Sequence, residues 1–276
     1  MVIRHGQRGG ARRFWKQWQT WVCLMMLAAL GVVGVWSASQ DTLVTAKPSY
    51  HLTNWLYLGV ASIFATCTLL IGWEIRGYWS GVLVDPKKMR MSLARLQTIL
   101  WTVLVVASFI TALMINLAKK NALNSSAIDA LDIAIPGELL VAMGISVGTL
   151  VGTKVVLNQK ETEHGTMTSA SPPDEVTATG IVVSAVPRGA VYRADRPQWR
   201  DLFQGDTAES KDTVDLGKVQ MFYVTVALLI GYGLVVADLF ASVPPMGITS
   251  LPALNEGFIA LLAISHAGYL TAKATS

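Results

Sequence analysis

Six long apolar runs constrain what this chain can fold into. Each approaches the ~20 residues that an α-helix needs to cross the hydrocarbon core of a bilayer. The runs cover residues 21–38, 55–73, 96–117, 139–157, 219–236 and 258–272. Only 14% of the 276 residues are charged, against about a quarter in soluble domains. The sequence therefore predicts an all-α transmembrane protein with a bundle of six helices.

The distribution of Lys and Arg predicts how these helices are inserted, because positively charged loops stay in the cytoplasm. With the N-terminus inside, all but three of the 22 Lys and Arg residues are cytoplasmic, the exceptions being Lys47, Lys119 and Lys120. We therefore expect both termini in the cytoplasm. The same distribution accounts for the net charge of +4 without a nucleic-acid partner, since basic flanks are attracted to anionic lipid headgroups.

The first apolar run has an alternative interpretation as a signal peptide. Basic residues precede it, and "WSASQ", residues 36–40, resembles a cleavage site. Its length, and the tryptophans Trp21 and Trp36 at its ends, favour a transmembrane helix instead. Cys23 and Cys67 fall inside apolar runs, where they indicate neither a disulfide nor a metal site.

Two parts of the sequence resemble each other. Residues 144–154, "GISVGTLVGTK", match residues 263–273, "AISHAGYLTAK". Residues 92–103, "SLARLQTILWTV", match residues 215–226, "DLGKVQMFYVTV". Each copy holds two apolar runs, so both copies must cross the membrane in the same sense. We therefore predict two parallel helical-hairpin repeats related by an axis along the membrane normal.

Small residues recur every four positions on one helix of each copy. They are Gly144, Gly148 and Gly152 in the first copy, and Ala263, Ala267 and Thr271 in the second. Small side chains let neighbouring helices approach closely. We expect these two faces to pack against each other; the alternative is that they line a pore or an interface in a homo-oligomer.

Polar side chains within or beside the apolar runs are candidates for a functional site. Ser146 and Ser265 are related by the repeat, and His266 follows Ser265. Such a serine commonly bonds the carbonyl four residues earlier, and a histidine either bonds a neighbouring helix or relays protons. Glu138 and Glu256 begin their helices, where the helix dipole favours a carboxylate. These five residues are the candidate lining of a pore or polar site.

The polarity of the sequence divides the chain into five segments. A basic cytoplasmic N-terminus, 1–20, precedes a first transmembrane hairpin, 21–75. The first repeat, 76–157, and the second repeat, 215–276, flank a small cytoplasmic insertion, 158–214. The insertion is the longest polar stretch, and we expect a cytoplasmic protein partner to bind there.

The insertion has three parts. Residues 161–175, "ETEHGTMTSASPPDE", have the composition of a flexible tether. Residues 180–195, "GIVVSAVPRGAVYRAD", contain two β-prone runs and predict a hairpin. The spacing of Trp199, Leu202 and Phe203 predicts a short helix that contacts the membrane surface or a partner.

A second surface piece precedes the first repeat. Residues 81–97, "GVLVDPKKMRMSLARLQ", are basic and contain the turn signal Asp85-Pro86. Ser92 is a favourable N-cap for the helix that follows, as Asp215 is in the second repeat.

From Gly81 onward the sequence resembles a group of uncharacterised bacterial multi-pass membrane proteins. The motifs that carry this resemblance are "MSLARLQTILWT", "PQWRDLFQG", "DLGKVQMF" and "ISHAGYLTAKA". They extend over about two thirds of the chain. The resemblance implies a location in the bacterial inner membrane and implies no activity.

The sequence carries none of the nucleotide-binding, zinc-protease, CxxC or nucleophile-elbow motifs that indicate enzymes. Its four histidines lie in separate segments and do not predict a metal site. We therefore expect no catalysis, no metal and no cofactor. The sequence favours a non-enzymatic membrane scaffold or anchor that docks a cytoplasmic partner and is able to oligomerise. The alternative is an ion channel or small-solute transporter whose path lies between the two repeats.

Overall fold

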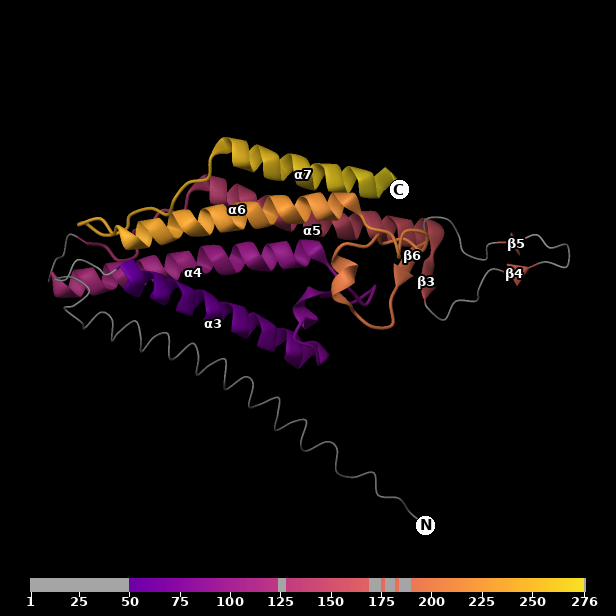
Figure 1. The fold of residues 1–276 in the computed structure, drawn as a ribbon, viewed down its shortest axis with the longest axis horizontal. Coiled ribbons are helices and arrows are strands. Elements are labelled where there is room, and N and C mark those ends of the chain that lie inside the picture. The colour runs from indigo at the N-terminus through magenta and orange to yellow at the C-terminus, as the bar shows by residue number, and fades with distance from the viewer. Residues whose placement is uncertain (1–49, 124–127, 169–174, 177–181, 184–189, 276) are drawn as a thin grey trace, which may run out of the picture. The chain divides into compact units, whose positions relative to one another are not determined.

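The structure is a computed structural model that describes residues 50–123, 128–168, 175–176, 182–183 and 190–275 (Figure 1). The described residues form two compact units. One unit takes its described residues from 50–82, 103–123, 128–135 and 233–252. The other takes its described residues from 83–102, 136–168, 175–176, 182–183, 190–232 and 253–275.

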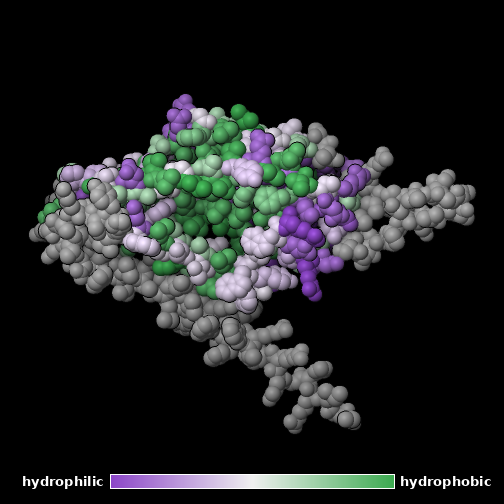
Figure 2. Space-filling view, in the orientation of Figure 1, coloured by the Kyte–Doolittle hydropathy of each residue, from purple (hydrophilic) through white to green (hydrophobic). Residues whose placement is uncertain are grey.

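Four helices in the described residues are long and apolar enough to cross a membrane. They are α3 (Tyr50–Arg76), α4 (Leu93–Ala122), α5 (Gly137–His164) and α6 (Leu216–Ala241). Large apolar side chains on these helices face outward, and Figure 2 shows hydrophobic side chains over their surfaces. Helices are thereby confirmed at four of the six expected spans. The last apolar run forms α7 (Glu256–Thr275), which is not among these four, and the first run lies outside the described residues.

In the first unit, α3 contacts the end of α6 through aromatic rings, since Tyr57 and Phe240 meet edge to face at 5.4 Å. The amide of Asn116 donates to the carbonyl of Ile248 at 2.8 Å and accepts from the amide of Ile248 at 2.7 Å. This buried pair fixes the loop before α7 to the end of α4. Gly81 is required here, because a Cβ on it would lie 2.2 Å from the carbonyl oxygen of Gly72.

In the second unit, the helices pair in the same direction. Thr149 of α5 contacts His266 of α7, and Gly152 lies beside Leu270, so both sequence numbers rise together along this interface. The start of α4 meets the start of α6 in the same way, through Gln97 and Met221. This is the direction that two parallel repeats require, although the duplication itself stays a prediction.

A polar cap closes one end of the second unit. We define the polar cap as residues 83–91 and 190–215. Its first part is the antiparallel pair β1 (Val84–Asp85) and β2 (Arg90–Met91), whose turn is fixed by the Asp85 side chain accepting from the amide of Lys87. This confirms the turn at Asp85-Pro86. The second part holds β6 (Val191–Arg193) and the short 3-10 helix η2 (Trp199–Leu202).

Two predictions about the insertion were wrong. The stretch expected to be a tether begins as helix, because α5 continues to His164 and ends at Gly165, whose φ of 78° favours glycine. Strand β3 (Thr166–Thr168) follows and pairs in parallel with β6. The expected hairpin does not form either, since β5 (Val182–Val183) pairs with β4 (Glu175–Val176) instead of with β6. The residues between β5 and β6, 184–189, lie outside the described part of the chain.

The two predicted helix starts are confirmed. Helix α4 begins immediately after Ser92, and α6 begins immediately after Asp215. At the second start the Asp215 carboxylate accepts a hydrogen bond from the amide of Lys218 at 3.2 Å, as an N-cap does. The polar cap is therefore followed directly by the first turn of α6, and only Ser92 separates it from the first turn of α4.

Candidate functional site

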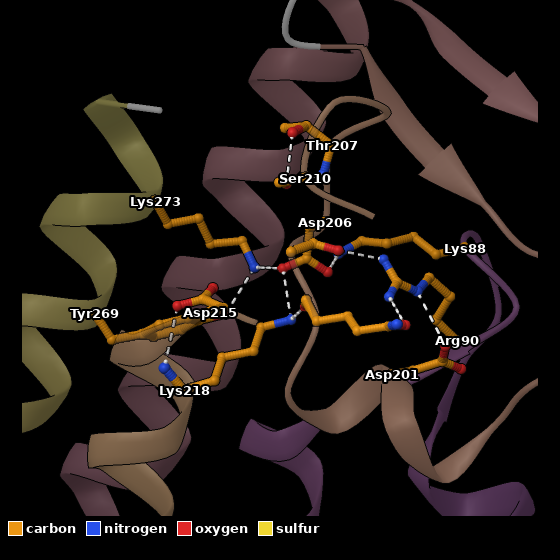
Figure 3. Close-up of polar contacts among 12 residues, drawn as sticks. Lys88, Arg90, Asp201, Asp206, Thr207, Ser210, Asp215, Lys218, Tyr269 and Lys273 are labelled. Atoms are coloured by element: carbon orange, nitrogen blue, oxygen red, sulfur yellow. Dashed lines mark hydrogen bonds and ion pairs between the residues drawn. The ribbon is translucent and has the colours of Figure 1, made fainter. Parts of the chain in front are cut away.

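The most unusual feature of the second unit is one buried carboxylate that meets three lysines (Figure 3). Asp206 belongs to the polar cap, and Lys88 approaches it from the turn between β1 and β2 at 3.1 Å. Lys218, in the first turn of α6, is also 3.1 Å away, and Lys273, near the end of α7, donates to the same carboxylate. A single side chain therefore joins the cap to two helices.

The surroundings of Asp206 make its charge state easy to assign. Burial alone would raise the pKa of its carboxyl, but Lys218, Lys273 and Lys88 outweigh burial and hold that pKa well below its usual range. Asp206 is therefore ionised at neutral pH. A carboxylate held this firmly is a poor proton acceptor, so its chemistry is electrostatic.

The surroundings of Lys88 disfavour its charged form. The pKa of its ammonium group is lowered to about 7, because burial, together with Lys273 and Lys218, outweighs the attraction of Asp206, which raises that pKa. At neutral pH this lysine is consequently close to its titration midpoint.

A second buried ion pair holds the two parts of the cap together. The guanidinium of Arg90, on β2, lies 3.4 Å from the carboxylate of Asp201 in η2 and donates to the carbonyl of Gly205. The same carboxylate accepts from the amide of Gln198 at 2.7 Å. Asp201 thus pairs with the Arg90 guanidinium and also accepts from the backbone amide that begins η2. These two contacts fix the loop that carries Asp206.

The ion pairs rest on an apolar base. Leu83, Val84, Met91, Leu202 and Met221 form one buried cluster with Leu93 and Tyr269. The hydroxyl of Tyr269 accepts a hydrogen bond from Lys273 at 2.7 Å. Apolar surroundings exclude water, so the charges attract one another more strongly than they would at an exposed surface.

A cavity of about 210 Å³ opens beside Asp206. Its polar lining includes the lysines Lys160 and Lys273 and the hydroxyls of Thr207, Ser210 and Thr213. Thr207 and Ser210 already bond each other at 2.7 Å. The cavity therefore adjoins the cluster but offers few uncommitted hydroxyl groups.

The expected packing of the small-residue faces is wrong within the described chain. Gly144 and Gly148 face open space, and of the three glycines only Gly152 has a close neighbour, Leu270. Ala267 and Thr271 are also exposed, and Ala263 is half-buried. The face of α5 that is buried instead carries Ser146, Thr149 and Thr153. The glycines point away from it because they are offset by about half a turn of the helix.

The structure places Ser146, Ser265 and His266 in the interior of the second unit. Nδ1 of His266 lies 2.7 Å from the hydroxyl of Thr149, which agrees with a histidine that bonds a neighbouring helix. The hydroxyls of Ser146 and Ser265 have no hydrogen-bond partner among the described residues. The expected bond to the carbonyl four residues earlier is therefore absent, although Thr149 does make it, at 2.9 Å.

The remaining predicted residues have separate environments. Glu138 lies in the first turn of α5 and Glu256 in the first turn of α7, as the sequence indicates. Trp199 is exposed, but Leu202 is buried and Phe203 packs edge to face on Phe222 at 5.2 Å. Leu202 thus belongs to the cap's interior and Phe203 packs against it, so Trp199 is the one of these three residues with a mostly exposed side chain.

Asp206 and its three lysines were not predicted from the sequence as a site. Lys88, Lys218 and Lys273 each stand near a helix end, where basic residues are expected for reasons of insertion alone. Nothing in the local sequence "FQGDT" marks its aspartate as buried. The one signal in the sequence is that Lys273 ends the second copy of the repeat at the position where Lys154 ends the first copy.

No protein-family model, no curated protein and no solved structure matches this chain. Within the described residues, no group of three or more His, Cys, Asp or Glu side chains is arranged to hold a metal ion. The geometry of the described residues is therefore the basis for a functional proposal.

Proposed function

We propose that this protein is a non-enzymatic membrane anchor that presents its polar cap at the cytoplasmic surface of a bacterial inner membrane and docks a protein partner there. The observation that carries this proposal is the buried attachment of Asp206 to α6 and α7 through Lys218 and Lys273. A cap attached to two helices by buried ion pairs has a fixed orientation on them. A fixed orientation favours binding, because less ordering remains to be done when the partner arrives.

The exposed side of η2 is the part of the cap that suits a partner best. Trp199 is 64% exposed, and the arginines Arg196 and Arg200 beside it are exposed as well. Leu202 fixes the opposite side of η2 in the apolar cluster. Tryptophan and arginine are the residues most often found at the energetic centres of protein interfaces. An exposed tryptophan on a well-anchored turn therefore supports the docking proposal.

The experiment that tests docking uses point substitution. Deleting residues 181–205 would be uninformative, because it removes Asp201 and Gly205, which hold Arg90. A photo-reactive amino acid at position 199 of the full chain in cells is expected to form a discrete adduct with one soluble protein. The matched control is position 79, since Trp79 is 52% exposed in the other unit.

Trp199→Ala is then expected to lower co-purification of the cross-linked protein at least about tenfold, as truncating an interface centre does. Trp79→Ala is expected to leave it unchanged. Equal adducts from both positions, or none from position 199, would show that η2 is not a docking surface.

A channel or small-solute carrier is the second candidate. It is supported by Ser146, Ser265 and the Nε2 atom of His266, which are buried between helices without a partner among the described residues. Buried polar atoms of this kind need water, an ion or another explanation. Ion flux through liposomes that exceeds a protein-free control, and is lost in His266→Leu but kept in the exposed control Ser242→Ala, would favour this function over the anchor.

A further inference from the structure

A second cavity, of about 140 Å³, lies where the first turn of α4, the β1–β2 turn, the end of α5 and strands β3 and β6 come together. Its lining is strongly basic. Five basic side chains border it, namely Lys87, Lys88, Arg95, Lys154 and Arg193, against the two acidic side chains Asp85 and Glu161. The basic excess distinguishes this cavity from the one beside Thr207 and Ser210.

The ion pairs around this cavity do not cancel its positive charge. Lys87 donates to Asn158 at 2.9 Å and lies 3.9 Å from Glu161, but both charged side chains are well exposed to solvent, so this pair is weak. Lys88 turns to Asp206, a carboxylate that Lys218 and Lys273 already share. The buried side of the lining is therefore also short of negative charge.

The positions of the basic residues fit one kind of ligand. Arg95 lies in the first turn of α4, and Lys154 lies on α5, and both helices are long enough to cross a membrane. Arg193 reaches the cavity from β6. Arginine presents a planar fork of donors that matches phosphate, and lysine adds a compact positive charge. The volume is small compared with pockets for drug-sized ligands, which are typically about 300 Å³ or more.

We propose that this cavity binds the phosphate group of an anionic ligand through Arg95, Lys154 and Arg193. The phosphate belongs either to an anionic lipid headgroup or to a small soluble phosphate compound. Basic pockets at the ends of transmembrane helices are suited to headgroups, and the cavity's place at the start of α4 favours that source. This proposal does not depend on whether a protein docks at Trp199.

The test uses the purified full chain in a neutral detergent, with the thermal unfolding midpoint as the readout. A ligand that binds only the folded state raises that midpoint as its concentration rises. The probes are phosphatidylglycerol, phosphatidylcholine as the lipid without net charge, and glycerol phosphate as the soluble compound. We expect a saturable rise with phosphatidylglycerol and none with phosphatidylcholine.

The decisive variant is Lys154→Gln with Arg193→Gln. Both side chains are exposed, so the fold should survive their replacement. We expect the half-saturating concentration to rise at least about tenfold, since two charge-assisted contacts are lost. The matched control is Lys120→Gln with Arg196→Gln. It also removes two positive charges, one from α4 and one from the polar cap, but neither residue lines the cavity.

The outcomes separate the two sources of phosphate. A rise with phosphatidylglycerol alone assigns the cavity to a lipid headgroup, and an equal rise with glycerol phosphate assigns it to a soluble phosphate compound. A rise that both double variants weaken equally would reduce the effect to general surface charge and overturn the proposal. The absence of any saturable rise would overturn it as well.

Discussion

The side-chain amide of Gln97 in α4 donates a hydrogen bond to the hydroxyl of Thr225 in α6 at 2.8 Å, and both residues are almost completely buried. The bond joins the second turn of α4 to the third turn of α6 inside an apolar unit. The sequence repeat pairs Thr225 with Thr102, yet Thr102 is exposed and donates only to the carbonyl of Thr98 in its own helix. Positions that are equivalent in the predicted repeat therefore have different structural roles.

Thr225→Val is expected to lower the free energy of unfolding by about 1 kcal/mol, because it removes the acceptor of an interhelical bond. Thr102→Val is the matched control and should change it by less than about 0.5 kcal/mol. Denaturant unfolding of the two variants in one detergent measures the difference. Equal losses would mean that the interhelical bond adds nothing.

Asp206→Asn should be among the most destabilising single substitutions in the polar cap. It leaves Lys88, Lys218 and Lys273 without their shared carboxylate in a buried site, and breaking such a pairing costs roughly 3–5 kcal/mol. Asp212→Asn, at an exposed carboxylate of the same loop, is the control. Adding Lys88→Met to Asp206→Asn should recover part of the loss, since one buried charge is then removed. A double variant no more stable than Asp206→Asn would contradict this explanation.

The pKa of Lys88 predicts how stability depends on pH. Because folding lowers that pKa from 10.5 to about 7, the unfolded chain binds more protons between these values. The cost of burying the charged lysine is therefore complete below about pH 7 and is relieved as the pH rises toward 10. Relative to Lys88→Met, the wild-type chain should gain stability over this range. Parallel unfolding curves for the two proteins from pH 7 to 10 would rule this out.

Asp206 makes stability depend on pH in the acid range. Its pKa in the folded chain lies well below the ordinary value of 3.8, so its stabilising contribution is complete above that value and is lost as the pH falls below it. Acid unfolding of the wild-type chain should therefore be steeper than that of Asp206→Asn below about pH 4. Circular dichroism between pH 5 and 2 follows this loss, and equal slopes would count against it.

Two glycines should respond oppositely to alanine. Gly81→Ala places a Cβ against the carbonyl of Gly72 at 2.2 Å, so the link between α3 and the following turn must shift and stability should fall by at least about 2 kcal/mol. Gly148→Ala meets no atom within 4 Å and should be neutral or stabilising by up to about 1 kcal/mol. Thermal unfolding of both variants gives the comparison. A strong loss in Gly148→Ala would indicate that a second copy packs on that face.

The apolar runs predicted four long apolar helices correctly, because a helix suited to burial in lipid has a signal that depends only on length and hydrophobicity. The helix starts after Ser92 and Asp215 were predictable for a similar reason, since capping is local. The face that each helix buries was not predictable in this way. In a membrane the face toward lipid is apolar as well as the packed face. The sequence therefore did not show that Thr149 lies on the packed face of α5 and its neighbour Gly148 does not.

The polar cap was harder still, because its contacts join distant residues. Lys88 is 118 residues from Asp206, and Lys273 is 67 residues from it. Periodicity and turn signals report only neighbours along the chain. They therefore predicted that the run forming β6 pairs with the run just before it, whereas β6 pairs with the more distant β3. Long-range ion pairs and short parallel strands leave no pattern that one sequence reveals.

The position of Lys273 near the end of α7 also sets an order of events during synthesis. Lys88 leaves the ribosome first among the partners of Asp206, and Lys218 follows soon after the carboxylate itself. The third ammonium group joins only after translation has passed residue 273 and the last helix has reached its place beside α5. The polar cap therefore gains its last ion pair late in synthesis, once α7 is complete.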